Sequence, residues 1–155
     1  MCKNPKNFIA HIRRSDKAKQ YVYEHNNNVA DIALILGEPF GLGKMAKIAG
    51  RHHDDGKNTA EFDAYIRAAS AGKSVVRGSV IHSTHGAVLL NQLAGRGDIY
   101  SKLVAEMSRS AIMSHHGLKD CISLDGSVLF EESEKRISDS YNGVKDYVYG
   151  HYGAS

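Results

Sequence analysis

The residues GRHHDDGK at positions 50–57 place two histidines directly before two aspartates. Imidazole nitrogens and carboxylate oxygens are ligands that suit first-row transition metals such as Mn, Fe, Co and Ni. An aspartate that lies between two cations can bridge them, and paired metals activate water and stabilise a leaving oxygen. The pattern therefore favours hydrolysis of a phosphate ester, although the spacing alone does not decide which histidine and which aspartate bind the metal.

The elements that must position these residues are helices, because apolar residues recur at 3- and 4-residue spacing and strand-like alternation is scarce. The stretches GEPFGLG and GKSVVRG mark breaks and are expected to be loops. Asn58 or Thr59 is expected to cap the third helix. We predict an all-α single domain over residues 1–155, a helical bundle with a metal site between its helices. The expected helices cover residues 15–36, 42–54, 60–70, 79–93 and 98–114, followed by an amphipathic segment at 130–148.

Histidine is unusually frequent, with nine in the chain, and four of the segments that carry it have a helical pattern. Helical spacing places His25 in an apolar stripe, His82 one turn before His85, and His115 on an inward line of the fifth helix. A single histidine on an apolar face is usually a packed core residue, but four such segments favour a shared ligand set. Since no cysteine belongs to this set, a cysteine-rich structural zinc site is not expected. The apolar residues expected on the same faces are Val22, Val29, Ile32 and Leu36 in the first helix, and Met107 and Ala111 in the fifth.

The composition is that of a globular domain, with 155 residues, 42% hydrophobic residues and a net charge of +3. No apolar run approaches the roughly 18 residues of a membrane span, and no secretory leader is recognisable. Cys2 and Cys121 are far apart in the sequence and are interpreted as reduced thiols, so a cytoplasmic location is expected. The positive charge is compatible with an anionic substrate such as nucleic acid but does not require one.

Five motifs in a fixed order resemble the HD superfamily of metal-dependent phosphohydrolases. More narrowly, they are similar to the HD nuclease domain of CRISPR-associated type I effector nucleases. The motifs are YEHNNNVADIA, AGRHHDDGK, EFDAYI, HSTHGAVLL and AIMSHHGLKD, and they cover about residues 15 to 121. In this family the metal-binding His-Asp pair is followed by one apolar residue and then Gly-Lys. The resemblance therefore implies that His53 and Asp54 form the pair, while Asp55 departs from the pattern and His52 takes a position that is normally a core residue.

The resemblance also implies roles for individual residues. One or two divalent metals (Mn, Fe, Co, Ni or Mg) are expected to be bound by His25, His53, Asp54, His82, His115 and His116. His53, Asp54 and Lys57 are the expected catalytic residues, with Lys57 facing the substrate phosphate or remaining a solvated lysine beside a turn. His52, Asp55, His85 and Asp120 are further candidates that would orient the metal ligands. Packing is the alternative role for His85, metal ligation is the alternative for His52 and Asp55, and Asp55 could also point to solvent.

One departure from the family concerns its last metal-binding aspartate, which lies on a later helix. Asp139 and Asp146 are the candidates here, but neither has the surrounding family pattern. The chain is therefore expected to be a shortened HD domain that stops before this aspartate, which leaves one metal position without its usual family ligand.

The function implied by the resemblance is a metal-dependent endonuclease, a hydrolase that cleaves single-stranded DNA in CRISPR antiviral defence. No phosphate-binding loop of an NTPase is present, because GEPFGLGKM and SAGKS both depart from that motif. A helicase on another polypeptide, or in a missing downstream region, would connect the domain to a CRISPR surveillance complex. The alternatives are a nucleotide or cyclic-dinucleotide phosphohydrolase and a catalytically degenerate metal-binding module.

Overall fold

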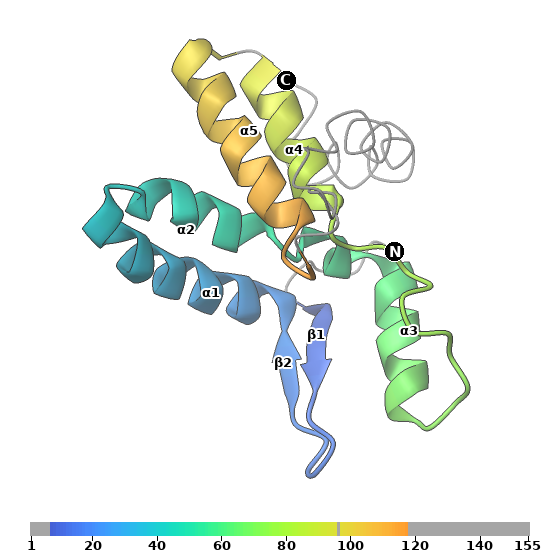
Figure 1. Ribbon diagram of the computed structural model, residues 1–155. Helices are drawn as coiled ribbons and strands as arrows, with labels where there is room; N and C mark the ends of the chain where they lie inside the picture. Colours follow the sequence, from blue (N-terminus) through green and yellow to red (C-terminus); the bar gives the residue numbers. More distant parts are fainter. Residues whose placement is uncertain (1–6, 96, 118–155) are drawn as a thin grey trace.

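The computed structural model describes residues 7–95 and 97–117. Within them the chain is mostly helical, with five α-helices and one two-stranded sheet (Figure 1). The predicted all-α class is confirmed, and the small sheet is an addition that the sequence analysis did not foresee. None of the described helices is both long and apolar enough to cross a membrane. Outside the described residues lie Cys2, Asp120, Cys121, Asp139, Asp146 and the segment expected at 130–148.

Two of the helix starts have side-chain caps. Thr59 Oγ1 accepts a hydrogen bond from the backbone N–H of Phe62, as predicted for the third helix. Asp98 caps the fifth helix in the same way, through the N–H of Ser101. The elements are β1 (Ile9–Ile12), β2 (Lys19–Tyr21), α1 (Val22–Gly37), η2 (Glu38–Phe40), α2 (Gly43–His52), η3 (Asp55–Asn58), α3 (Ala60–Ser70), α4 (His85–Gly95) and α5 (Ile99–Met113).

Two helix starts were predicted too early. The first helix begins at Val22, not at residue 15, because the preceding residues pair with β1 in an antiparallel hairpin. The turn of this hairpin contains Lys17 with a φ of 60°, and Asp16 Oδ1 accepts a hydrogen bond from the N–H of Ala18. The fourth helix begins at His85, so His82 lies in the loop before it and not one helical turn earlier.

Helices α1 and α2 pack closely as a hairpin, because small residues meet where they cross. A Cβ atom on Gly50 would lie 3.1 Å from the Cα of Ala30, so a larger residue would push the two helices apart. The buried residues of α1 are Val22, Asn26 and Ala30. Ile32 and Leu36 are instead 58% and 68% exposed, so their predicted inward position is wrong.

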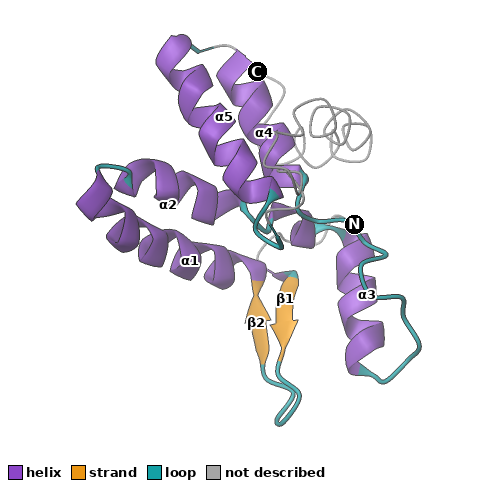
Figure 2. Cartoon of the chain, viewed as in Figure 1, coloured by secondary structure: helices purple, strands orange, loops and turns teal. Residues whose placement is uncertain are grey.

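The main apolar core lies between α4 and α5, with α2 packed against it. It consists of Ala87, Val88, Leu89, Leu90, Ile112 and Met113. The predicted inward line of α5 is also wrong, since Met107 is 45% exposed and the buried face is centred on Ile112 and Met113. The two helical hairpins, α3 and the sheet meet at one junction, where Figure 2 shows the segments that follow α2 and α5. Residues from distant parts of the sequence are brought together at this junction.

Candidate metal centre

The candidate site is centred on the carboxylate of Asp54, which is buried between the end of α2 and η3. Its Oδ2 atom lies 3.0 Å from Nε2 of His25 on α1 and 3.2 Å from Nε2 of His53. The two imidazole nitrogens are themselves only 3.2 Å apart. The buried Lys57 on η3 places its Nζ atom 2.8 Å from the same oxygen. Oδ2 is therefore surrounded by two imidazoles and one ammonium group.

The other oxygen of this carboxylate, Oδ1, faces a different set of imidazoles. Nε2 of His115 lies 3.5 Å from it, and Nε2 of His82 lies 3.6 Å from it. His116 completes the set, since its Nε2 atom lies 2.8 Å from that of His82. Asp54 and these three histidines each offer a ligand atom within 4.8 Å of the others, which is compatible with one metal ion. One carboxylate thus presents its two oxygens to two sets of imidazoles, as a bridging ligand does.

Backbone carbonyls orient two of the imidazole rings. The Nδ1–H group of His53 donates to the carbonyl oxygen of Gly50 at 2.8 Å, and that of His115 donates to Ile112 at 2.6 Å. When such a ring is neutral, its lone pair is on Nε2 and points toward the carboxylate of Asp54. Electron-rich atoms that face one another in this way repel unless a proton or a metal ion lies between them.

Two buried atoms of the cluster fit a cation in particular. Asp54 Oδ1 and His115 Nε2 are both buried and have no well-formed hydrogen bond among the described residues. Buried polar atoms are almost always paired, since leaving one without a partner costs about 1–3 kcal/mol. A divalent metal between these two atoms would satisfy both of them.

The electrostatics of the cluster keep Asp54 ionised. Burial alone would raise the pKa of Asp54, but the imidazoles of His115, His25 and His53 and the charge of Lys57 hold this pKa far below its ordinary value. Burial also opposes charge on His53, yet its hydrogen bond to Asp54 raises the pKa of His53. For His82 burial prevails and lowers the pKa, so this ring is neutral and able to bind a metal.

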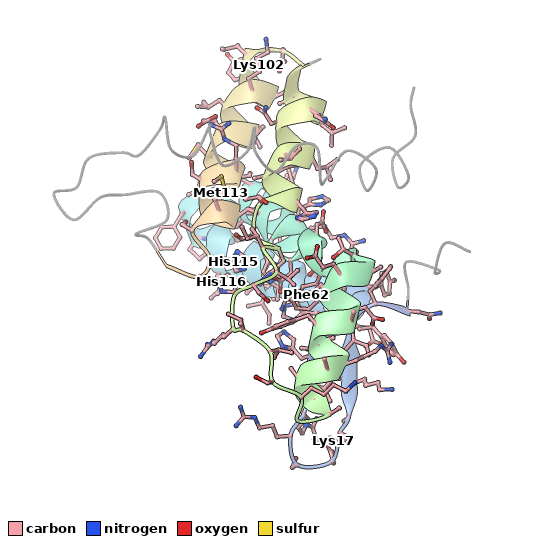
Figure 3. The ribbon with its side chains drawn as sticks, turned by 90° about the vertical axis from the view of Figure 1, so that its right-hand side faces the viewer. Lys17, Phe62, Lys102, Met113, His115 and His116 are labelled. Carbon is pink, nitrogen blue, oxygen red and sulfur yellow. The ribbon has the colours of Figure 1, made fainter. Side chains whose placement is uncertain are left out.

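The residues of the cluster come from four segments of the chain, and most of the ligand candidates lie at helix ends or in loops. His82 precedes α4. His115 and His116 follow the last turn of α5, as Figure 3 shows. The ring of His82 also packs edge-on against Phe62 on α3, with the ring centroids 5.1 Å apart. Loop backbones are not bound to helical periodicity, so neighbouring side chains such as His115 and His116 can converge on one point.

His52 and Asp55 form a separate pair, although they adjoin the central residues in the sequence. His52 Nδ1 and Asp55 Oδ2 are 2.8 Å apart, and Asn26 on α1 donates to the other oxygen of Asp55 at 3.2 Å. Asp55 is buried, so this network connects α1, α2 and η3 directly behind the site. The structure therefore places His53 and Asp54 in the cluster. His52 and Asp55 instead stabilise the backbone segment that carries these two residues.

Of the remaining candidates, His85 is buried at the first residue of α4. Burial and the nearby His82 lower the pKa of His85 to about 4, so its ring is neutral. Its Nδ1 atom would lie 2.6 Å from a Cβ atom on Gly56, which shows that the ring packs against η3. The candidate Asp120 is outside the described residues.

His11, which was not predicted as a site residue, lies on β1 beside the cluster. Its ring centroid is 4.8 Å from that of His25, and its Nε2 atom is 3.4 Å from Nζ of Lys57. Burial and the charge of Lys57 lower the pKa of His11 to about 4. The one available signal was the hydrophobic run FIAHI, in which a histidine interrupts an apolar strand. It was overlooked because the family motifs begin after it and no strand was predicted there.

No protein-family model matches the chain. Searches of curated proteins and of solved structures likewise gave no match. The resemblance to HD nucleases therefore rests on the sequence motifs, and the function has to be inferred from the geometry of the site.

The arrangement can bind a metal ion, and its donor set favours certain metals. Six histidines, namely His11, His25, His53, His82, His115 and His116, lie around a single ionised carboxylate. Imidazole-rich sites suit transition metals such as Mn, Fe, Co and Ni better than Mg, which prefers oxygen ligands.

Gly56 is expected to be essential for the shape of the site. A Cβ atom at this position would collide with the backbone of His82, and both partners are backbone segments that cannot easily move. We expect Gly56→Ala to destabilise the fold by about 1–3 kcal/mol, as overpacking does, and to weaken metal binding by displacing His82. Thermal unfolding and metal titration would measure these two effects. Gly95→Ala is the matched control, because a Cβ atom there meets nothing within 4 Å; equal stability of the two variants would contradict the prediction.

Proposed function

We propose that this chain is an HD-type metal-dependent phosphohydrolase, and specifically a nuclease that cleaves single-stranded DNA in CRISPR antiviral defence. The observation that carries the proposal is the carboxylate of Asp54, whose Oδ2 faces His25 and His53 while its Oδ1 faces His82 and His115. A shared carboxylate between two imidazole sets is suited to a pair of metals and to phosphoester hydrolysis. The sequence motifs that resemble HD nucleases contain all of these residues.

The protein residues have separate tasks in this mechanism. His25 and His53 would hold one metal with Oδ2 of Asp54, and His82, His115 and His116 would hold another with Oδ1. Metals bound there would lower the pKa of a water molecule and neutralise the charge that develops on the phosphate. The backbone carbonyls of Gly50 and Ile112 keep the rings of His53 and His115 in the ligating tautomer. Lys57, whose ammonium group is at the site, would donate to a phosphate oxygen.

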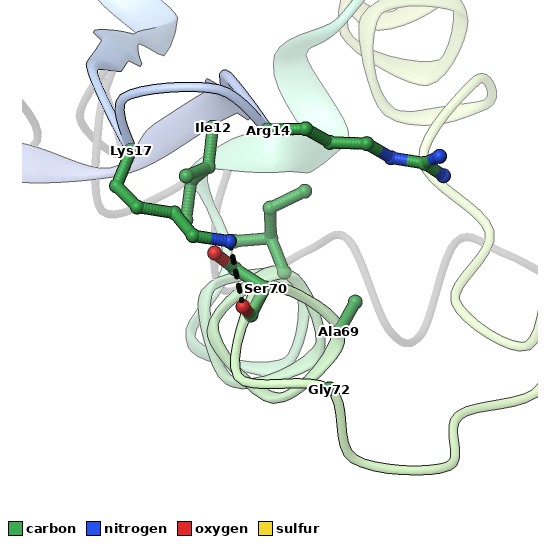
Figure 4. A pocket seen from close by; sticks show the side chains of 7 residues that line it. Ile12, Arg14, Lys17, Ala69, Ser70 and Gly72 are labelled. Atoms are coloured by element: carbon green, nitrogen blue, oxygen red, sulfur yellow. Dashed lines mark hydrogen bonds between the residues drawn. The ribbon is translucent and has the colours of Figure 1, made fainter.

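Basic residues near the site support an extended polyanion as the substrate. Arg13, Arg14, Lys17 and Lys19 are exposed on the β1–β2 hairpin, the same hairpin that carries His11. Arg14 and Lys17 line a pocket between this hairpin and the end of α3, where Lys17 Nζ donates to the carbonyl oxygen of Ser70 at 3.4 Å (Figure 4). Cationic grooves beside an active site follow the phosphate backbone without reading sequence. An extended strand bound at the metal centre could continue along this hairpin from His11 toward Arg14 and Lys17.

The biological setting follows from the family resemblance. In this proposal the domain acts in the cytoplasm and receives single-stranded DNA from a helicase. The helicase is part of another polypeptide or of a downstream region, and it connects the nuclease to a CRISPR surveillance complex.

The test of this function is metal content together with cleavage of defined substrates. We expect purified protein to bind divalent transition metals, and to cleave a single-stranded oligonucleotide with Mn, Co or Ni faster than with Mg. Chelation should abolish cleavage, and adding back the metal should restore it. Faster hydrolysis of nucleotides or cyclic dinucleotides than of oligonucleotides would reject the nuclease assignment, and absence of metal binding would reject catalysis as a whole.

The basic hairpin gives a second expected result. Replacing Arg14, Lys17 and Lys19 together by Gln should raise the KM for a single-stranded oligonucleotide about tenfold. It should also reduce the salt dependence of binding. The slope of log binding constant against log salt concentration should become less negative by about 0.7 for each phosphate that the protein no longer neutralises. Hydrolysis of bis(p-nitrophenyl) phosphate should not change, because this small substrate reaches only the metal centre.

A control for charge alone is the triple replacement of Lys44, Lys47 and Lys102 by Gln. These exposed residues lie on α2 and α5, and Figure 3 shows Lys102 at the opposite end of the structure from Lys17. Equal loss of oligonucleotide binding in both triple variants would contradict a role for the hairpin.

A further inference from the structure

We propose that His11 is a metal ligand on the Oδ2 side of Asp54, so that the β1–β2 hairpin completes a position for which the late aspartate of the family has no clear counterpart in this chain. The inference rests on the proposed metal-dependent function but concerns one residue that the family motifs do not contain. His11, His25 and Asp54 each offer a ligand atom, and these atoms all lie within 4.8 Å of one another.

The strand geometry explains why His11 faces the site. Ile9 pairs with Tyr21 and His11 pairs with Gln20, so two steps along β1 correspond to one step along β2. Such an irregularity of the β-bulge type redirects the side chains that follow it. Ile9 and Ala10 are both buried, which uses both faces of the strand for packing, and His11 is the exposed residue directly after them. In a regular strand Ile9 and His11 would share one face.

Lys57 contacts both of the groups that would hold this metal. Its ammonium group lies 2.8 Å from Oδ2 of Asp54 and 3.4 Å from Nε2 of His11, so both atoms face the same cationic group. The flexible side chain of Lys57 would turn away from this space when a metal binds. Both ligand types suit transition metals, and a metal bound by His11, His25 and Asp54 would retain open positions for water and phosphate.

His11 would also make the two sides of the carboxylate chemically alike. Oδ1 is associated with three imidazoles, those of His82, His115 and His116. Oδ2 has His25 and His53 within 3.2 Å, and His11 would be its third imidazole. Each oxygen of Asp54 would then have three imidazoles nearby, and on the Oδ2 side those of His11 and His25 offer ligand atoms that could hold one metal ion together with Asp54.

The test compares metal stoichiometry and affinity in the full chain and its variants. In His11→Ala we expect the loss of one metal per chain, or a weakening of that metal by at least about tenfold, measured by elemental analysis and calorimetric titration. The absorption spectrum of the Co²⁺-loaded protein should change, because it reports the ligands of the metal directly. His11→Asp should restore the stoichiometry, since a carboxylate can replace the imidazole as a ligand. Gln20→Ala is the matched control, because Gln20 is the cross-strand partner of His11 and should leave both metals bound.

The outcomes separate this proposal from the proposed function. If the wild-type chain binds no metal, both proposals fail. If His11→Ala keeps the stoichiometry, affinity and Co²⁺ spectrum of the wild type while Asp54→Asn loses metal, the ligand assignment of His11 is wrong and the metal-dependent function stands. Loss of the metal in Asp139→Asn or Asp146→Asn, with none in His11→Ala, would likewise assign the position to a late aspartate.

Discussion

Asp54→Asn should abolish metal-dependent cleavage, with a fall in kcat of at least about 10³-fold, because water activation and charge neutralisation at phosphorus both depend on the bound metals. The substitution keeps the shape of the side chain but removes the negative charge that both of its oxygens present to the imidazoles. Metal content should fall on both sides of the carboxylate. Substitution of His82 alone should affect only the Oδ1 side, where its Nε2 atom lies. Elemental analysis and oligonucleotide cleavage would measure these effects.

Asp55→Asn is the matched control for this variant. Asp55 is also a buried carboxylate, it adjoins Asp54 in the sequence, and it is paired with His52 and Asn26. Both substitutions break buried polar networks and should therefore lower stability, but only Asp54→Asn should remove metal from a chain that remains folded by circular dichroism. Retention of full metal content and cleavage in Asp54→Asn would overturn the proposed mechanism.

Metal affinity should fall steeply as the pH decreases from 8 to 6. The pKa of His53 is raised above its ordinary value by Asp54, so a proton competes with the metal for Nε2 of His53 near neutral pH. The pKa of His82 is lowered, so this ring stays neutral over the same range and does not contribute. Displacing one proton makes the apparent Kd rise about tenfold for each pH unit below the pKa of His53. Calorimetry in buffers with different ionisation enthalpies would count the protons released.

The variant His53→Ala is the control for this pH effect, through the metal affinity that it retains. This variant lacks the imidazole with the raised pKa, so its weaker metal binding should depend less on pH than that of the wild type. A wild-type affinity that is equal at pH 6 and pH 8 would show that His53 is not a ligand.

Much of the helical structure could be predicted from local sequence. The third and fifth helices were predicted nearly to the residue, because Thr59 and Asp98 accept hydrogen bonds from backbone groups of their own first turn. The starts of the first and fourth helices were predicted too early. Residues 19–21 pair with the neighbouring strand β1 instead of joining the first helix, and His82 packs against Phe62 in the loop before the fourth helix. Ile32 and Leu36 have helical spacing but lie outside the close contact between Ala30 and Gly50.

The residue types available for chemistry follow from the amino-acid sequence alone: a histidine-rich chain, a His-Asp pair with Gly-Lys two residues later, and histidines in four separate segments. The sequence also determined the mainly helical class, because periodicity and caps act within a few residues of one another. Only the tertiary structure decided that Asp54 presents its two oxygens to separate imidazoles, that His52 and Asp55 pair behind it, and that His11 lies beside His25. Most of these contacts join residues that lie far apart in the sequence, so local patterns carry no information about them. The direction of a side chain in a loop or beside a strand irregularity depends on contacts such as that of Gly56 with His82, and no local spacing encodes them.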